Sequence, residues 1–227
     1  MRAWLHRTLV EMVPRDHRQS ARDLRRRQVV TSVFAVLGAV VLALSLSIEP
    51  GSALFYPATL VLAAVWTVGA FASGPLHLGR IMSPAGPRRP VVAPILLGLA
   101  LAGVFVVGAL VVRRVPFLEE QVSTILEHAD QGTTVLLVLI TAVNGVAEEL
   151  FFRGAAYAAT TRYPVQVTTL AYTAVTLATG NLMLAFAALL LGAVVGLQRR
   201  ASGGILAPIL THVTWSLTML LALPALF

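Results

Sequence analysis

Cysteine and lysine are both missing from this sequence, and charged residues of any kind are few. The absence of cysteine excludes disulfides, thiol nucleophiles and cysteine-ligated metal sites. Only 12% of the residues are charged while 57% are hydrophobic, whereas a soluble globular domain carries charge on about a quarter of its residues. The composition therefore indicates a polytopic membrane protein.

The positive charge is unevenly distributed along the chain. All 17 basic residues are arginine, and eight of them fall within residues 1–28. A net charge of +7 raises the question of nucleic acid, but arginine ahead of a first apolar run is typical of the cytoplasmic side of a membrane protein. We therefore predict no nucleic-acid partner, a basic cytoplasmic or interfacial segment over residues 1–28 that contacts membrane lipid, and a cytoplasmic N-terminus.

Seven apolar stretches follow the basic segment. They cover residues 29–48, 54–71, 91–112, 133–152, 165–179, 182–197 and 205–223. Since a spanning helix needs about 20 mainly apolar residues, we predict an all-α fold. It is a polytopic bundle of about seven transmembrane helices over residues 29–227, with short interfacial helices at residues 1–13 and 116–132. The fifth and sixth stretches are short, so we expect them to be tilted or half-buried.

Ionisable residues stand at the end of the fourth stretch, in the sequence NGVAEELFFRG. Each such side chain near the middle of a span costs about 2.5–3.5 kcal/mol to insert. Glu149 and Arg153 are four residues apart and hence adjacent on a helix, so Arg153 can neutralise Glu149 while Glu148 stays free. Two carboxylates with different surroundings are a typical source of a catalytic acid or base. The alternative is a plain ion cluster at the cytoplasmic end of the helix.

A second polar position, His212, lies in the last apolar stretch. It stands about two turns from the cytoplasmic end of that stretch, a depth similar to that of Glu148, so we predict that the two side chains meet inside the bundle. The fifth stretch adds a seam of hydroxyl groups on one helical face: Thr169, Thr173, Thr176 and Thr179. Threonine in a membrane helix usually bonds back to its own chain, so the seam is weak evidence of function.

Glu148, Glu149 and Arg153 resemble the Glu-Glu-x-x-x-Arg motif of the CAAX-protease and bacteriocin-processing (CPBP, or Abi) intramembrane proteases. His212 is similar to the first position of their His-x-x-x-Asn (or Asp) motif, and the resemblance covers about residues 95–220. It implies an intramembrane endopeptidase in which Glu148 is the general base and His212 acts beside it on the water or the reacting carbonyl. Glu149 and Arg153 are implied to be a structural and electrostatic pair.

The sequence departs from the family pattern at two motifs. Thr179 or Asn181 stands where the family's Phe-x-x-x-His motif has its histidine, and Ser216 replaces the asparagine of the last motif. These three residues are candidate substitute donors. The resemblance also implies zinc or another divalent metal as a candidate cofactor, but Glu148 and His212 are too few for a three-ligand zinc site.

Two other functions stay open. The missing motif residues favour a catalytically impaired family member that binds a peptide or a partner membrane protein as a scaffold. A transporter is a third hypothesis, because an intramembrane carboxylate can relay protons. We expect an integral protein of a bacterial cell membrane that acts on a peptide or membrane-protein substrate, and the sequence sets neither that substrate's identity nor the oligomeric state.

Overall fold

The computed structural model describes residues 2–49, 52–83, 86–129 and 133–227. Within them the regular elements are helices. In chain order these are α1 (Arg2–Leu9), α2 (Ala21–Leu46), α3 (Phe55–Ser73), α4 (Val92–Val112), α5 (Pro116–Ala129), α6 (Thr134–Glu149), the π-helix η1 (Leu150–Ala156), α7 (Tyr157–Ala159), α8 (Pro164–Leu177), α9 (Leu182–Ser202), α10 (Leu206–Ala222) and the 3-10 helix η2 (Leu223–Ala225). The predicted all-α fold class is confirmed.

In the described part of the chain, six helices are long and apolar enough to cross a membrane: α2, α3, α4, α6 continued through η1 and α7, α9, and α10 with η2. Seven full spans are not confirmed. The predicted span over residues 165–179 is α8, which has 14 residues and is about 21 Å long, against a hydrocarbon core of about 30 Å. By contrast, α9 continues past the predicted residue 197 to Ser202 and reaches spanning length.

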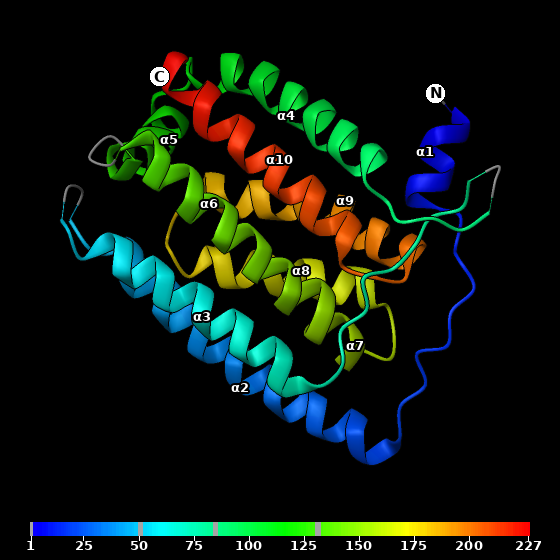
Figure 1. Ribbon diagram of the computed structural model, residues 1–227. Coiled ribbons are helices and arrows are strands. Elements are labelled where there is room, and N and C mark those ends of the chain that lie inside the picture. Colours follow the sequence, from blue (N-terminus) through cyan, green and yellow to red (C-terminus); the bar gives the residue numbers. More distant parts are fainter. Residues whose placement is uncertain (1, 50–51, 84–85, 130–132) are drawn as a thin grey trace.

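The helices form a bundle of roughly parallel and antiparallel rods (Figure 1). α10 packs between α4 and α6, α3 packs on α2 and α6, and α8 lies along α9. α8 is short, but it still leads the chain from one end of the bundle toward the other before α9 begins. As a result, the start of α2 and the end of α10 lie at opposite ends of the bundle (Figure 1). The start of α2, α7 and the end of α9 share one end with α1, which we call the α1 end.

The basic N-terminal segment packs against the bundle. α1 packs on α9, and the Val13 amide donates to the Ala201 carbonyl at 3.1 Å. α2 begins at Ala21, where the Ser20 hydroxyl caps the helix by accepting from the Asp23 amide. The last arginines of the segment therefore belong to the first span. The predicted surface helix after the third stretch is α5, and its expected end at residue 132 lies outside the described residues.

An aromatic cluster holds η1 against α3. Trp66, Phe151 and Phe152 are each at most 1% exposed, and the Trp66 ring lies 4.6 Å and 5.2 Å from the two phenylalanine rings. On α2, Gly38 faces this tryptophan so closely that a Cβ atom there would lie 2.0 Å from the Trp66 ring. Because these large rings bury well only in one arrangement, the cluster sets the rotation and depth of the residues next to it in the chain, Glu149 and Arg153.

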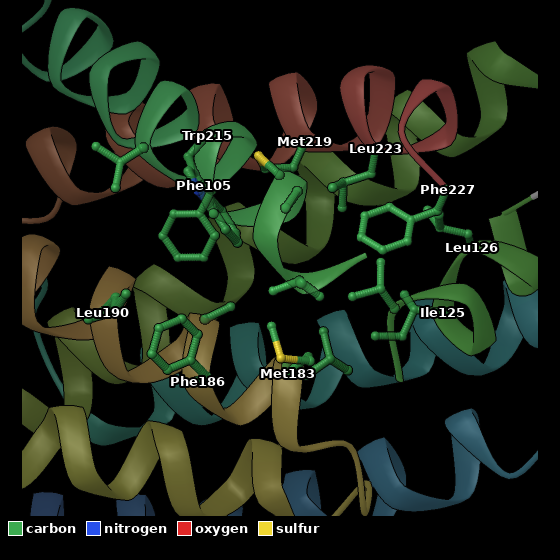
Figure 2. Close-up of a pocket in the computed structure, with 17 residues that line it drawn as sticks. Phe105, Ile125, Leu126, Met183, Phe186, Leu190, Trp215, Met219, Leu223 and Phe227 are labelled. Atoms are coloured by element: carbon green, nitrogen blue, oxygen red, sulfur yellow. The ribbon is translucent and has the colours of Figure 1, made fainter. Parts of the chain in front are cut away.

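An apolar cavity of about 250 Å³ opens where α4, α5, α9 and α10 meet. Figure 2 shows the side chains of Phe105, Met183, Phe186, Trp215 and Met219 gathered around it. Its lining carries almost no polar surface, which suits an acyl or other apolar chain. Trp215 lies at one side of the cavity and packs edge-on against Phe105 at 5.0 Å.

Candidate active site

Glu149 and Arg153 form a buried ion pair where α6 passes into the π-helix η1. Arg153 Nη1 donates to Glu149 Oε1 at 3.1 Å, and both side chains are 0% exposed. Their complete burial argues against a solvated ion cluster at a helix end. Since removing an ion from water costs several kcal/mol, the pair needs further contacts to be stable.

Aromatic and backbone groups surround the Arg153 guanidinium. It lies 4.8 Å from the centroid of the Tyr172 ring in a cation–π contact. On α9, Gly192 leaves room for it, because a Cβ atom there would lie 3.1 Å from Arg153 Nη2. The Arg153 carbonyl accepts a hydrogen bond from Arg199 Nε at 2.6 Å. Arg199 thus supports a π-helical turn, a rare geometry that is frequent at functional sites.

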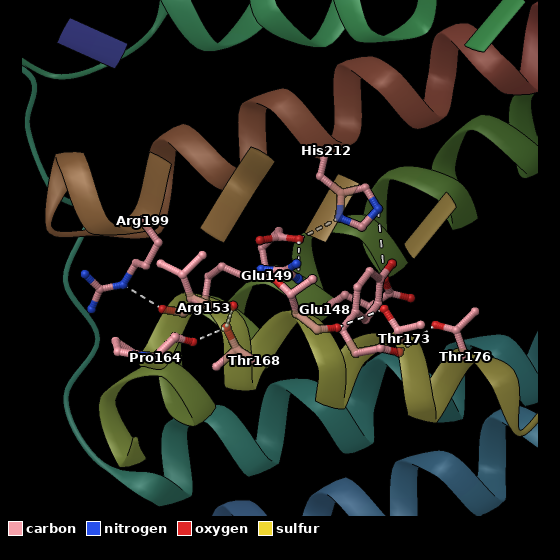
Figure 3. Close-up of polar contacts among 12 residues, drawn as sticks. Glu148, Glu149, Arg153, Pro164, Thr168, Thr173, Thr176, Arg199 and His212 are labelled. Atoms are coloured by element: carbon pink, nitrogen blue, oxygen red, sulfur yellow. Dashed lines mark hydrogen bonds and ion pairs between the residues drawn. The ribbon is translucent and has the colours of Figure 1, made fainter. Parts of the chain in front are cut away.

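His212 of α10 lies between the two glutamates. Its Nδ1 is 2.8 Å from Glu149 Oε1, and its Nε2 is 3.9 Å from Glu148 Oε2. Figure 3 shows the imidazole facing both carboxylates, with Arg153 on the far side of Glu149. The ring is only 4% exposed. The two side chains expected to meet inside the bundle, Glu148 and His212, are therefore neighbours.

Tyr172 of α8 completes this group. Its hydroxyl donates to Glu148 Oε2 at 2.6 Å, and its ring contacts that of His212 at 6.4 Å between centroids. No sequence motif pointed to Tyr172, which lies beside the threonine seam. The available signal was a tyrosine in an apolar helix, since a buried tyrosine hydroxyl usually has a hydrogen-bond partner. We call Glu148, Glu149, Arg153, Tyr172 and His212 the inner cluster.

Comparison with known protein families gives a match to part of the chain. Residues 130–218 match the family of Rce1-like proteins, described as type II CAAX prenyl endopeptidase Rce1-like. This segment is therefore similar to the CAAX-protease family. It includes α6 and most of α10, and hence the whole inner cluster. No curated protein and no solved structure matches the chain.

Three other predicted residues of the Rce1-like segment lie outside the hydrogen bonds of the inner cluster. Asn181 caps α9 with its side-chain oxygen and donates through Nδ2 to the Gln121 carbonyl at 2.6 Å. The Thr179 hydroxyl donates to a carbonyl of its own helix end. Ser216 lies one turn after His212 on α10. Among the described residues, none of the three forms a hydrogen bond with a member of the inner cluster.

The ligands offered by the Rce1-like segment do not fit a zinc site. Across the described residues, no group of three or more histidine or acidic side chains is arranged to hold a metal ion, whereas catalytic zinc takes three protein ligands. Glu149 Oε1 already contacts Arg153 and His212. The donor set therefore does not support the zinc implied by the family resemblance.

Proposed function

We propose that the chain is an intramembrane endopeptidase in which Glu148 activates the water that attacks the peptide bond. The observation that carries this proposal is the 3.9 Å separation between Glu148 Oε2 and His212 Nε2, which come from two different spanning helices. A water at hydrogen-bonding distance from both groups has a base on each side. Such placement is what general base catalysis requires.

Glu149 and Arg153 hold the histidine in its working orientation. The Glu149 carboxylate, paired with Arg153, accepts the Nδ1 proton of His212, which leaves the Nε2 lone pair facing Glu148. A buried carboxylate fixes the tautomer of a catalytic histidine in the same way in serine proteases. Glu149 is therefore a positioning residue, and Arg153 keeps its carboxylate charged and in place.

Tyr172 takes the donor role that the sequence assigned to Thr179 or Asn181. Tyr172 and Thr176 have the spacing of the family's Phe-x-x-x-His motif, and α8 reaches Glu148 through Tyr172. We therefore assign the second-motif histidine position to Thr176. In this assignment the Tyr172 hydroxyl positions Glu148 in the resting enzyme and is available to the oxyanion once Glu148 takes a proton.

The substrate approaches from within the membrane. The Trp215 ring, which borders the apolar cavity, has its centroid 6.3 Å from that of His212. A peptide carrying an apolar or lipidated segment can place that segment in the cavity and its peptide bond beside the inner cluster. The family description names a prenyl endopeptidase, and a prenylated peptide is a substrate of this kind.

The arginines at the α1 end support an orientation. Residues 15–27, the loop between α3 and α4, and the end of α9 bring arginines to this end, while Arg113 and Arg114 are the exceptions at the other. By the positive-inside rule, the α1 end and the N-terminus face the cytoplasm of a bacterial cell.

The test is peptide cleavage by the protein reconstituted in lipid vesicles. A peptide ending in a CAAX sequence is offered with and without a prenyl group, and products are identified by mass spectrometry. We expect Glu148→Gln to lower the rate about a hundredfold or more, whereas Glu127→Gln, which changes an exposed glutamate of α5, leaves it unchanged. Equal rates for the wild type and Glu148→Gln would remove Glu148 from the mechanism.

A scaffold is the second candidate, and the missing motif histidine favours it. In that case the wild type cleaves neither peptide, while the wild type and Glu148→Ala retain the prenylated peptide equally in a pull-down. Cleavage that depends on Glu148 excludes this alternative.

A further inference from the structure

A polar cavity, separate from both the apolar cavity and the inner cluster, lies at the α1 end. It has a volume of about 230 Å³ and lies between the N-terminal segment, the loop after α3, α7 and the end of α9. The basic side chains that line it come from parts of the chain far apart in sequence: Arg15, His17, Arg18, Arg27, His77 and Arg199. We call it the basic cavity.

Two of its arginines are buried, and one of them has an unused hydrogen-bond donor. Arg27 is 4% exposed; its Nη2 donates to the Pro75 carbonyl at 3.2 Å, but its Nη1 is buried without a hydrogen-bond partner in the described structure. Arg199 uses Nε on the Arg153 carbonyl, and Figure 3 shows its terminal nitrogens turned away from the inner cluster. A buried donor of a charged group is costly to leave unpaired.

The backbone makes room for Arg27 at a specific position. Gly74 ends α3 with φ 142°, and a Cβ atom there would lie 2.5 Å from Arg27 Nη2. Only glycine adopts this backbone conformation readily. The guanidinium is therefore seated by the fold and does not simply project into solvent.

Two histidines stack at the wall of the basic cavity. The rings of His17 and His77 are parallel within 8°, with centroids 3.9 Å apart. Burial, His77 and the nearby Arg199 and Arg15 lower the pKa of His17 to about 4, while Asp16 opposes this shift. Burial, Arg199 and Arg27 also lower the pKa of His77. Burial first, and then the neighbouring positive charges, thus favour the neutral form of both rings.

No acidic side chain lines the basic cavity among the residues that the structure describes. Two exposed carboxylates lie close by: Asp16 pairs with Arg18 at the rim at 3.4 Å, and Asp23, which accepts from the Ser20 hydroxyl, attracts Arg27 from the same helix. Among the described residues, no carboxylate forms an ion pair with Arg15, Arg27 or Arg199, so their positive charge is only partly balanced there.

We propose that the basic cavity binds a phosphate group, supplied by an anionic lipid headgroup or by free phosphate. Arginine donors reach it from the N-terminal segment, α2 and α9, which matches a tetrahedral oxyanion with acceptors on several sides better than a planar carboxylate. The cavity lies where spanning helices end, at the depth of lipid headgroups. This site goes beyond the proposed peptidase activity and does not depend on it.

Two binding measurements on the full chain distinguish the sources. In the first, delipidated protein in neutral detergent is titrated with inorganic phosphate and followed by ³¹P NMR. In the second, native mass spectrometry counts the phosphatidylglycerol and phosphatidylcholine molecules that the protein retains from mixed micelles. Specific binding in the first measurement alone identifies free phosphate. Retention of phosphatidylglycerol over phosphatidylcholine identifies a headgroup.

Variants separate the basic cavity from general surface charge. Arg27→Gln is expected to weaken binding about tenfold or more, and Arg18→Gln, which changes an exposed side chain on the rim, weakens it in the same direction without threatening the fold. Arg25→Gln removes the same charge from an exposed position on α2 that does not line the cavity and is the matched control. Equal binding by the wild type, Arg18→Gln and Arg25→Gln in both measurements would overturn the proposal.

Discussion

The inner cluster and the basic cavity lie on either side of Arg199. They differ in whether their charged groups have partners of opposite charge within the chain. In the inner cluster, Glu149 contacts both Arg153 and His212, so opposite charges meet within the chain. In the basic cavity, Arg27 Nη1 has no partner among the described residues and the lining is uniformly basic or neutral. In the first region the charges are paired within the chain, although Glu149 Oε2, Arg153 Nε and Arg153 Nη2 have no hydrogen-bond partner among the described residues; in the second region the proposed partner is an external anion. We therefore expect the removal of a charge to have different effects on stability in the two regions.

Removing the arginine of the inner cluster should have the largest effect. Arg153→Met leaves Glu149 buried without its cation, and we expect a loss of about 3–5 kcal/mol in the free energy of unfolding. The same change in the basic cavity, Arg15→Met, alters an exposed side chain, and its effect on the free energy of unfolding should stay within about 0.5 kcal/mol. Equilibrium unfolding in mixed micelles measures both.

A double variant checks the cause of that loss. Arg153→Met combined with Glu149→Gln removes both charges, so part of the lost stability should return. If the double variant is as unstable as Arg153→Met alone, packing of the guanidinium, and not the unpaired charge, explains the loss.

Arg199 connects the two regions, and its replacement should have an intermediate effect. Arg199→Lys keeps the charge but lacks a donor at the Nε position that bonds the Arg153 carbonyl, so we expect a loss of about 1.5–3 kcal/mol in unfolding free energy. Arg200→Lys, at the neighbouring and less buried position, is the control. Equal stability of the two variants would show that the carbonyl of η1 does not need Arg199.

Tyr172→Phe should mainly affect chemistry. The variant keeps the ring beside Arg153 but loses the hydrogen bond to Glu148, and we expect about a tenfold lower kcat with the unfolding midpoint nearly unchanged. Tyr163→Phe, at an exposed tyrosine, is the matched control for the peptide-cleavage assay. Unchanged kcat in Tyr172→Phe would assign this tyrosine a packing role only.

The smallest expected effect is a pH dependence at the basic cavity. His17 has a folded pKa of about 4 against an ordinary 6.5, so between these values the unfolded chain binds more protons than the folded one. Stability should therefore rise with pH from about 4 to about 6.5 and then level off. His17→Gln should flatten this part of the profile, while His6→Gln, at an exposed position on α1, should not. Identical profiles for the wild type and His17→Gln would contradict the assignment.

Much of the fold is predictable from hydropathy, and the predicted span that the structure does not confirm has a local explanation. The apolar stretches at residues 29–48 and 91–112 correspond to α2 and α4 because a run of that length has no stable state in lipid other than a helix. The run at residues 165–179 did not become a full span. One face of α8 packs closely on α9 at Gly192 and Gly196, while Val167, Leu170 and Leu177 on α8 are exposed. This close packing holds a helix of 14 residues in the bundle although it is shorter than a full span.

Helical periodicity and charge alone determined the membrane bundle, the Glu149–Arg153 pair and the likeness of depth between Glu148 and His212, since these depend on neighbours along one chain segment. Only the tertiary structure decided that His212 faces both glutamates, that Tyr172 bonds Glu148, and that Arg27 and Arg199 face one cavity. Those contacts join different helices, and they depend on how far each helix is rotated and how closely it packs, which is set by ring packing at Trp66 and by glycines on facing helices.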